Sequence, residues 1–370
     1  MAQKRNIFEE VGEGRPAATE PQGGMIDAGK RGRNPVRRWL QVIFVLVALM
    51  IAVGGLTRLT DSGLSITEWK PIMGIIPPLT DAAWHDAFEK YRQIPEYHIV
   101  NRGMGLEAFK AIFWWEWGHR FLGRIIGIVF FVPFVWFWWA RRIPRHLTPR
   151  LIALFLLGGL QGGIGWYMVR SGLVDRVDVS HYRLAVHLGV AVIILGLLLW
   201  TALDFEHEPR WMEDAAAGSV HAWTAVALLV LIFLQVLLGA LVAGLKAGLS
   251  HNTWPLMDGA LVPSGLGAMS PWYLNVFENV LTVQFNHRMA AYAIAVVALW
   301  HVASVLRTTT ASADIRLSAG MLGLGVVAQI ALGIWTLLAQ VPLSLGLAHQ
   351  AGAAMVFSLA VWHLHRIVRA

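Results

Sequence analysis

The sequence predicts an all-α integral membrane protein in which eight transmembrane helices form two repeated four-helix bundles. Composition is the first observation: 56% of the 370 residues are hydrophobic and only 14% are charged, which is too apolar for an ordinary soluble domain. The second is a series of apolar stretches of about 18 or more residues, the length that crosses a bilayer as a helix. The third is the return of first-half motifs, in the same order, in the second half.

The apolar stretches give the expected membrane spans, numbered here in chain order. They cover 38–57, 119–140, 151–170, 184–203, 220–244, 285–306, 316–339 and 344–365. Residues 1–35 precede the first span and lack the apolar core of a signal peptide. We therefore expect a disordered cytoplasmic tail whose basic end lies on anionic lipid.

Lysine and arginine set the expected orientation. They are concentrated in "GKRGRNPVRR" before the first span, "RRIPRHLTPR" after the second and "HLHRIVRA" at the C-terminus. The positive-inside rule then places both termini in the cytoplasm. The acidic connection 204–218 falls on the same side by parity and is the expected cytoplasmic linker, whereas the long loops 58–117 and 245–284 face outward.

Charge and cysteine content narrow the possible chemistry. The formal charge of +7 fits the predicted orientation, so no nucleic acid partner is expected. The chain has no Cys, which excludes disulfides, thiolate metal sites and Cys-linked heme. Chemistry is therefore expected from histidine, from carboxylates or from a bound cofactor.

The two halves of the chain match residue by residue. "GLSITEWKPIMG" after the first span corresponds to "GLSHNTWPLMDG" after the fifth, and "LQGGIGWYM" in the third corresponds to "AQIALGIWTLL" in the seventh. The matched ionisable residues are His119-Arg120 with His287-Arg288, and His187 with His349. An even number of spans per unit makes the halves parallel. We expect an N-terminal bundle at 36–203 and a C-terminal bundle at 219–370.

The four matched histidines predict a cofactor site in each bundle. They fall on spans two, four, six and eight, which run in one direction, so all four lie in the outer part of the membrane. Ionisable residues inside a membrane usually mark a site, and two imidazoles from facing helices suit the axial positions of a heme iron. Zinc sites usually need three or four ligands, and no extra carboxylate accompanies His187, His287 or His349.

The residues beside these histidines allow two interpretations. Arg120 and Arg288 either pair with heme propionates or extend to the lipid headgroups. Glu116 corresponds to Gln284 in the second half. This difference indicates one reaction site and one storage site, unless Glu116 only caps the start of the second span.

The first outer loop carries its own helix signal. In "TDAAWHDAFEKY" the residues Trp84, Phe88 and Tyr91 share one face of an amphipathic helix. Such a helix is suited to lie on the membrane, to cover a heme site or to receive a partner. His85 and His98 of the same loop are expected to be solvated.

A transmembrane di-heme cytochrome b that transfers electrons is the alternative function. His287 and His301 are 14 residues apart, as are His349 and His363, so each pair lies on nearly one helix face, about 21 Å apart. Two helices hold stacked hemes in this way. The repeat opposes the alternative because the positions that correspond to His301 and His363 in the first half are not histidine. A heme or quinone transporter is a weaker alternative, since no charged residue lies near the membrane midplane.

Four motifs together also carry a resemblance to a known family. They are "GGLTRLTDSGLSITEWKPIMGIIPP", "EWGHRFLGR", "NHRMAAY" and "LAHQAGA". With the paired repeat, they make residues 35–368 resemble the heme A synthases, and the absence of Cys is similar to the proteobacterial and mitochondrial branch. The resemblance implies an oxidoreductase of the bacterial inner (plasma) membrane. Such an enzyme oxidises a methyl group of heme O to a formyl group, giving heme A for cytochrome c oxidase.

The resemblance also implies roles for the matched residues. His287 and His349 would be the axial ligands of the iron of a resident heme b. His119 and His187 would face the substrate heme, and Glu116 would assist catalysis. The partners that it admits are heme O synthase, cytochrome c oxidase assembly factors, membrane lipid and a second copy of the chain.

Overall fold

The computed structural model describes residues 34–70, 73–173, 177–205 and 220–369. Within these ranges, eight helices are long and apolar enough to cross a membrane, which confirms the predicted fold class. They are α2 (Pro35–Leu59), α5 (Leu106–Trp139), α6 (Thr148–Gly172), α7 (His181–Asp204), α8 (Val220–Gly244), α10 (Val280–Arg307), α11 (Ala313–Leu338) and α12 (Leu343–Arg369). Nearly all of the predicted tail 1–35 and linker 204–218 lies outside the described residues.

The helix ends follow local capping rules. Asn34 caps α2, because its side chain accepts a hydrogen bond from the Val36 backbone N–H, and Pro35 occupies the first helical position. Asn279 caps α10 and Ser312 caps α11 in the same manner. Helix α5 begins 13 residues before the predicted second span at 119–140. Charged residues at its start lower the hydropathy there without breaking the helix.

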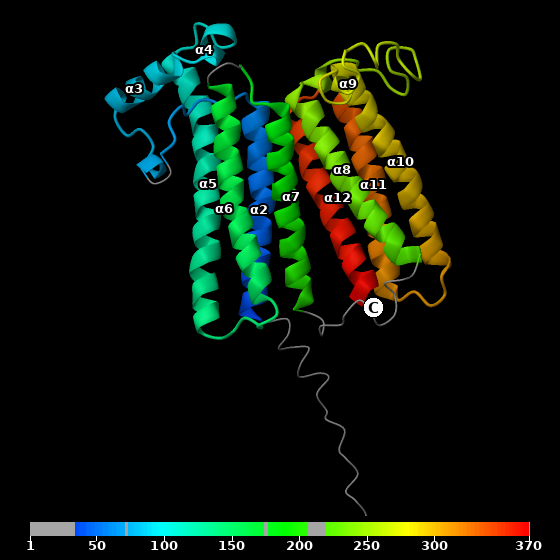
Figure 1. Cartoon of the computed structure of the whole chain (residues 1–370). Helices are drawn as coiled ribbons and strands as arrows, with labels where there is room; N and C mark the ends of the chain where they lie inside the picture. The colour runs from blue at the N-terminus through cyan, green and yellow to red at the C-terminus, as the bar shows by residue number, and fades with distance from the viewer. Residues whose placement is uncertain (1–33, 71–72, 174–176, 206–219, 370) are drawn as a thin grey trace, which may run out of the picture.

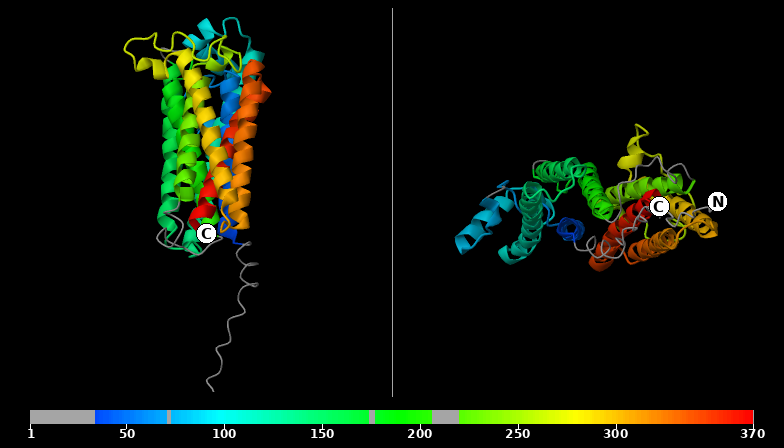
Figure 2. Two further views of the ribbon diagram at one scale, coloured as in Figure 1. Left: turned by 90° about the vertical axis from the view of Figure 1, so that its right-hand side faces the viewer. Right: turned by 90° about the horizontal axis from the view of Figure 1, so that it is seen from below.

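The transmembrane helices form two rings of four. In the first ring α2, α5, α6 and α7 each pack against two neighbours, and in the second α8, α10, α11 and α12 do the same (Figures 1 and 2). We call these rings the N-terminal and the C-terminal bundle. They meet where α2 and α7 pack against α12 and where α7 packs against α8. One apolar core runs through both, with Leu40, Leu195, Leu228 and Phe357 among its buried residues.

Polar contacts also cross the boundary between the bundles. The Gln350 side chain of α12 donates a hydrogen bond to the Ile51 carbonyl of α2 at 2.5 Å. Gly55 is required beside it, because a Cβ atom there would lie 2.2 Å from the Gln350 amide oxygen. Lys246 forms an ion pair with Asp61 at 3.4 Å, and these two residues occupy matching positions in the repeat.

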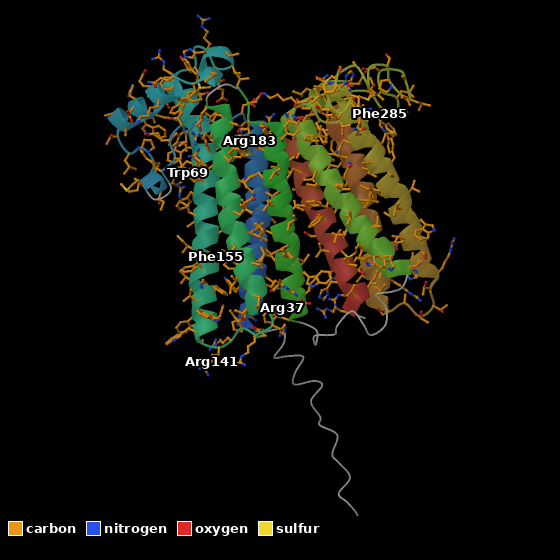
Figure 3. The ribbon with its side chains drawn as sticks, in the orientation of Figure 1. Arg37, Trp69, Arg141, Phe155, Arg183 and Phe285 are labelled. Atoms are coloured by element: carbon orange, nitrogen blue, oxygen red, sulfur yellow. The ribbon has the colours of Figure 1, made fainter. Side chains whose placement is uncertain are left out.

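The molecule has two distinct ends. One end, the loop face, carries the long connections 60–105 and 245–279, whereas the other, the terminal face, carries the start of α2 and the end of α12 (Figure 1). Arg37 and Arg141 lie at the terminal face (Figure 3). There Asp204 of α7 accepts hydrogen bonds from Arg150, Arg369 and His365 at 2.5, 3.0 and 3.2 Å. This cluster ties α7 to α6 and to α12.

The first loop builds a cap over the N-terminal bundle. It contains η1 (Met73–Ile75), α3 (Asp81–Tyr91) and α4 (Pro95–Ile99). The predicted amphipathic helix is α3, and its apolar side packs on the start of α5: the rings of Trp84 and Phe113 lie 5.0 Å apart, and those of Phe88 and Phe109 lie 5.1 Å apart. That side is therefore covered by α5 and is not free for the membrane. His85 and His98 are exposed, as predicted.

The matching loop of the C-terminal bundle is simpler. Within the described residues it carries only η2 (Ala247–Leu249) and α9 (Leu274–Phe277) as helical elements. The cap is therefore a property of one half of the repeat.

Candidate functional site

The four matched histidines come together in pairs near the loop face. His119 and His187 lie on α5 and α7, and His287 and His349 lie on α10 and α12. In each bundle the two helices stand diagonally across the ring, so their side chains can meet at its centre. Phe285, two residues before His287, lies near the loop-face end of α10 (Figure 3).

The spacing of the C-terminal pair suits one iron atom. The ring centroids of His287 and His349 are 6.4 Å apart and the ring planes are inclined at 77°. Two imidazoles on opposite sides of a metal, each with a bond of about 2.0 Å from ring nitrogen to metal, would place their centroids about 6 Å apart. The pair therefore fits the two axial positions of a heme iron.

Each of the four imidazoles lies against a glycine of the neighbouring helix. A Cβ atom at these glycines would lie between 2.8 and 3.3 Å from an imidazole atom, closer than side chains normally approach. The pairs are His119 with Gly54, His187 with Gly165, His287 with Gly239, and His349 with Gly333. The glycines themselves occupy matching positions in the repeat. Their role was not predicted, although their recurrence beside the histidine motifs was a usable signal.

The chemistry of the ligand set favours heme over a bare metal ion. The Nδ1 atoms of His187 and His287 are buried and have no hydrogen-bond partner among the described residues. Buried polar atoms are normally paired, and an unpaired ring nitrogen is available to a metal. Within the described ranges, no group of three or more His, Cys, Asp or Glu residues is arranged to hold a metal ion. Two histidines per site fit heme and do not fit structural zinc.

Glutamine amides hold the backbone that carries the histidines. Gln161 of α6 donates to the carbonyl of His187 at 2.8 Å, and Gln329 of α11 donates to the carbonyl of His349 at 2.7 Å. Gln235 of α8 makes the same contact with His287 at 2.9 Å. The matching position in α2 is Met50, so this third tie exists only in the C-terminal bundle. The recurrence of Gln161 and Gln329 was visible in the sequence, but their contact was not.

The two arginines bind the loops above the site. Arg120 donates to the carbonyls of Ile66 and Glu68 and to Glu116, at 3.0, 3.2 and 2.6 Å. Arg288 makes the equivalent three contacts, with His251, Thr253 and Gln284. Three of the five N–H groups of each guanidinium are thus used. The prediction that they pair with propionates stays a prediction, and two N–H groups per arginine remain for it.

Glu116 is buried, with 2% of its surface exposed. One carboxylate oxygen accepts hydrogen bonds from the Ser65 hydroxyl and the Ile66 backbone N–H, both at 2.7 Å, and the other accepts from Arg120. Because α5 begins at Leu106, Glu116 lies in the third turn of the helix. The interpretation of Glu116 as a cap of the helix start is therefore wrong. The matching Gln284 is held by the Ala247 carbonyl and by Arg288.

His301 and His363 do not form a heme site. Their Nε2 atoms are hydrogen bonded to each other at 2.7 Å, and both residues are fully buried. An iron between them would require the two nitrogens to be about 4 Å apart, at about 2.0 Å per bond. The Nδ1 atoms are also occupied, by Thr224 at 2.7 Å and Ser318 at 2.8 Å. A second stacked heme at this level, as in the alternative function, is therefore excluded.

Comparison with known proteins shows the family of the chain. The profile of the COX15-CtaA family, described as cytochrome oxidase assembly protein, matches residues 37–361. A protein of Parvibaculum lavamentivorans named heme A synthase is 53% identical over 351 residues, which cover 94% of this chain and 99% of that protein.

Other relatives named heme A synthase match the chain over a similar length. Those of Chelativorans sp. and Cereibacter sphaeroides are 51% and 49% identical, over 94% and 98% of this chain and 95% of each relative. The chain belongs to the heme A synthase family. The matches extend across both bundles and therefore span the positions of all four histidines.

Proposed function

We propose that the chain is a heme A synthase, an oxidoreductase that converts a methyl group of heme O into the formyl group of heme A. The observation that carries the proposal is the duplicated pair of facing histidines, of which only one has a buried carboxylate beside it. The names of the relatives, at about half identity over nearly the whole chain, agree with this function.

In this proposal the two histidine pairs have different roles. His287 and His349 hold a resident heme b, which when bound supplies one-electron oxidation and reduction. Their spacing of 6.4 Å and the two glutamine contacts with their backbone carbonyls support a permanently held group. His119 and His187 hold the substrate heme in the N-terminal bundle. Gly54 and Gly165 have no side chain, so the imidazoles of His119 and His187 lie directly against the neighbouring helices α2 and α6.

Glu116 is the group of this chain that exchanges protons with the substrate. Ser65, the Ile66 N–H and Arg120 fix its carboxylate in one position, so it acts without reorganisation. A positioned carboxylate accepts a proton from a reacting group or stabilises positive charge that develops on it. Arg120 and Arg288 anchor the loops over the two sites, and their free N–H groups are available to the propionates of each heme.

The proposed setting follows from charge. By the positive-inside rule, the arginines of the terminal face favour the cytoplasm for that face and both termini, and the outside of the inner membrane for the loop face. Both heme sites then lie near the outer surface. Heme O synthase is the expected source of the substrate and cytochrome c oxidase assembly factors are the expected recipients of the product. A second copy of the chain is a further expected partner.

Pigment analysis tests the function directly. The chain is expressed in cells that make heme O but no heme A, and hemes are extracted from the membranes and separated. We expect heme A in these cells and none in cells that express His119→Ala. Extraction of heme O and heme B alone from the wild-type cells, with the protein present in the membrane, would overturn the proposal.

A further inference from the structure

The cap over the N-terminal bundle contains a second buried carboxyl group, Glu96. It lies on α4 and only 3% of its surface is exposed. Its Oε2 atom has no hydrogen-bond partner among the described residues. A carboxyl group buried with an unpaired oxygen destabilises a fold. Stability therefore does not explain why the cap holds a glutamate at this position.

Ionisable groups from several elements face Glu96. Burial, together with nearby negative charges, raises the pKa of Glu96 to about 8, while the positive charge of Lys246 opposes the rise. The charged groups are Glu116 on α5, Asp61 after α2, Asp178 before α7 and Lys246 after α8. Near neutral pH both the neutral and the ionised form of Glu96 are thus within easy reach, as proton transfer requires.

Tyr91 is a buried neighbour of Glu96 in the cap. Its hydroxyl interacts with Glu96, and its environment includes the charge of Glu116 as well. The Asn101 amide donates a hydrogen bond to the Tyr91 hydroxyl at 2.7 Å, which fixes its position. Tyr91 is fully buried against Phe109 of α5. The cap, at the loop-face end of the N-terminal bundle (Figure 1), thus holds a buried hydroxyl and a buried carboxyl group within the electrostatic influence of Glu116.

The C-terminal bundle has none of these groups. Gln284 stands where the N-terminal bundle has Glu116, and no counterpart of α3 or α4 covers its described loop. The two titratable carboxyl groups therefore accompany one site of the duplicated pair. This is the site to which the proposed function assigns the reaction.

We propose that Glu96 is the proton-relay residue of this reaction, which passes protons between Glu116 and the water at the loop face. The inference rests on the proposed function. Conversion of a methyl into a formyl group removes two hydrogens from the carbon and adds one oxygen. A proton that Glu116 accepts must leave before Glu116 can accept another. Transfer to the Glu96 carboxylate regenerates the Glu116 carboxylate, and release from Glu96 to water regenerates Glu96.

The test compares Glu96→Gln with Glu107→Gln in the full-length, heme-loaded protein. Glu107 lies beside the cap, at the start of α5, and 84% of its side chain is exposed. It is therefore the matched control. Formation of heme A from added heme O is followed at pH values on both sides of about 8. The wild-type rate should rise as Glu96 ionises, because only the carboxylate accepts a proton.

The relay predicts a loss of both rate and pH profile in one variant. Glu96→Gln should form heme A at least about tenfold more slowly, since positioned proton transfer contributes about 10²-fold or more, and it should lack the ionisation near 8. Glu96→Asp should restore part of the rate together with the ionisation. Glu107→Gln should behave as wild type, and resident heme should be unchanged in all three.

The remaining outcomes overturn one proposal or the other. Wild-type protein that makes no heme A would refute the proposed function. Active wild-type protein, with a Glu96→Gln variant whose rate and pH profile match Glu107→Gln, would refute the relay alone. A uniform loss of rate that keeps the ionisation near 8 would also refute it, because that pattern indicates a structural role.

Thermal stability gives an independent readout. The folded protein keeps the Glu96 proton between pH 4.5, the ordinary pKa, and about 8, while the unfolded chain loses it. The stability contribution of Glu96 therefore falls as pH rises through that window. Unfolding is followed by the absorbance of the resident heme. The thermal midpoint of Glu96→Gln, relative to that of the wild type, should increase from pH 4.5 to about 8 and then stay constant. A variant that loses stability across the window would show that Glu96 is a structural carboxylate.

Discussion

The two bundles carry the same scaffold and differ in what surrounds it. Both have a His-Arg pair, a second histidine, facing glycines and an arginine tied to the loop. In the N-terminal bundle Arg120 is neutralised by Glu116, whereas in the C-terminal bundle Arg288 meets the uncharged Gln284. Only the C-terminal bundle adds Gln235 beneath its histidine. A duplicated site that keeps its ligands and changes its charge is suited to hold in one copy and to react in the other.

Packing differs in the same direction. Helix α6 buries Leu151, Leu154 and Gly172 alone among its described residues, whereas α11 buries several along its length. Gly158 of α6 stands where α11 has the buried Val326, and a Cβ atom at Gly158 would meet no atom within 4 Å. Helix α6 is therefore less covered by its neighbours than the matching α11.

The largest expected effect is the loss of reaction without loss of the resident heme. His119→Ala or His187→Ala should reduce heme A formation below detection, because the proposed substrate site loses one of its two histidines. Absorbance of the purified protein should still show most of the resident heme. Loss of all heme from either variant would mean that the bundles are one site and would end the comparison.

The reverse pattern is expected from the other pair. His287→Ala or His349→Ala leaves one imidazole, so the iron of the resident heme would become five-coordinate. The purified wild-type protein should show a six-coordinate, low-spin b-type spectrum, and each variant should lose most of it. An unchanged spectrum in both variants would remove these residues as ligands.

Exchange of one ionisable group should convert the reaction site toward the storage site. Glu116→Gln keeps the shape and an acceptor for Arg120 while removing the charge. We expect the variant to fold, to keep its resident heme and to lose about 10²-fold in heme A formation, with an alcohol intermediate among the extracted hemes. The matched control Gln284→Glu should leave the rate of heme A formation nearly unchanged. A near-normal yield of heme A from Glu116→Gln would reduce Glu116 to a structural role.

The spans and the pairing of the matched histidines could be predicted because they depend on local composition and on the repeat. Hydropathy located all eight helices, but it placed the start of the second span at 119, whereas α5 begins at Leu106. The error arose because charged residues such as Glu107 and Lys110 do not interrupt a helix that rises above the membrane. The same error produced the incorrect interpretation of Glu116 as a cap.

Contacts between helices could not be predicted from spacing along one helix. The 14-residue interval places His301 below His287 and His363 below His349 on the same helix faces. This spacing is compatible with one heme and with two. The distance between the facing imidazoles decides, and their ring centroids are 6.4 Å apart at the loop-face pair but 5.0 Å apart at the lower pair. The facing glycines and the Arg120 contacts with loop carbonyls depend on packing in the same way.

A smaller effect is expected from the extra glutamine of the C-terminal bundle. Gln235→Met reproduces the N-terminal residue Met50 and removes the tie to the His287 carbonyl. Groups that orient a metal ligand typically change affinity by about 10–100-fold, and we expect the lower end because the His287–Gly239 contact remains. Heme transfer from the purified variant to an apo heme acceptor should be about tenfold faster. The exchange Met50→Gln is the control and should leave that rate unchanged.

Substitution of His301 is expected to have the smallest effect on heme content and heme A formation. The di-heme alternative would instead expect the largest effect at this residue. His301 joins His363 on α12 and Thr224 on α8 through hydrogen bonds of 2.7 Å, and Ser318 on α11 completes the chain. This network connects all four helices of the C-terminal bundle and satisfies all four ring nitrogens. His301→Ala would leave the buried Nε2 of His363 without its partner, which costs about 1–3 kcal/mol.

The variant should therefore unfold at a lower temperature while it keeps the heme content and the rate of heme A formation of the wild type. His98→Ala, at an exposed position of the cap, controls for the substitution itself. Heme per chain, measured by pigment extraction against protein concentration, separates the two functions. A loss of one heme from His301→Ala would mean that His301 and His363 move apart to hold iron. The C-terminal bundle would then contain a second heme site, and the comparison of one reacting with one storing site would no longer describe the molecule.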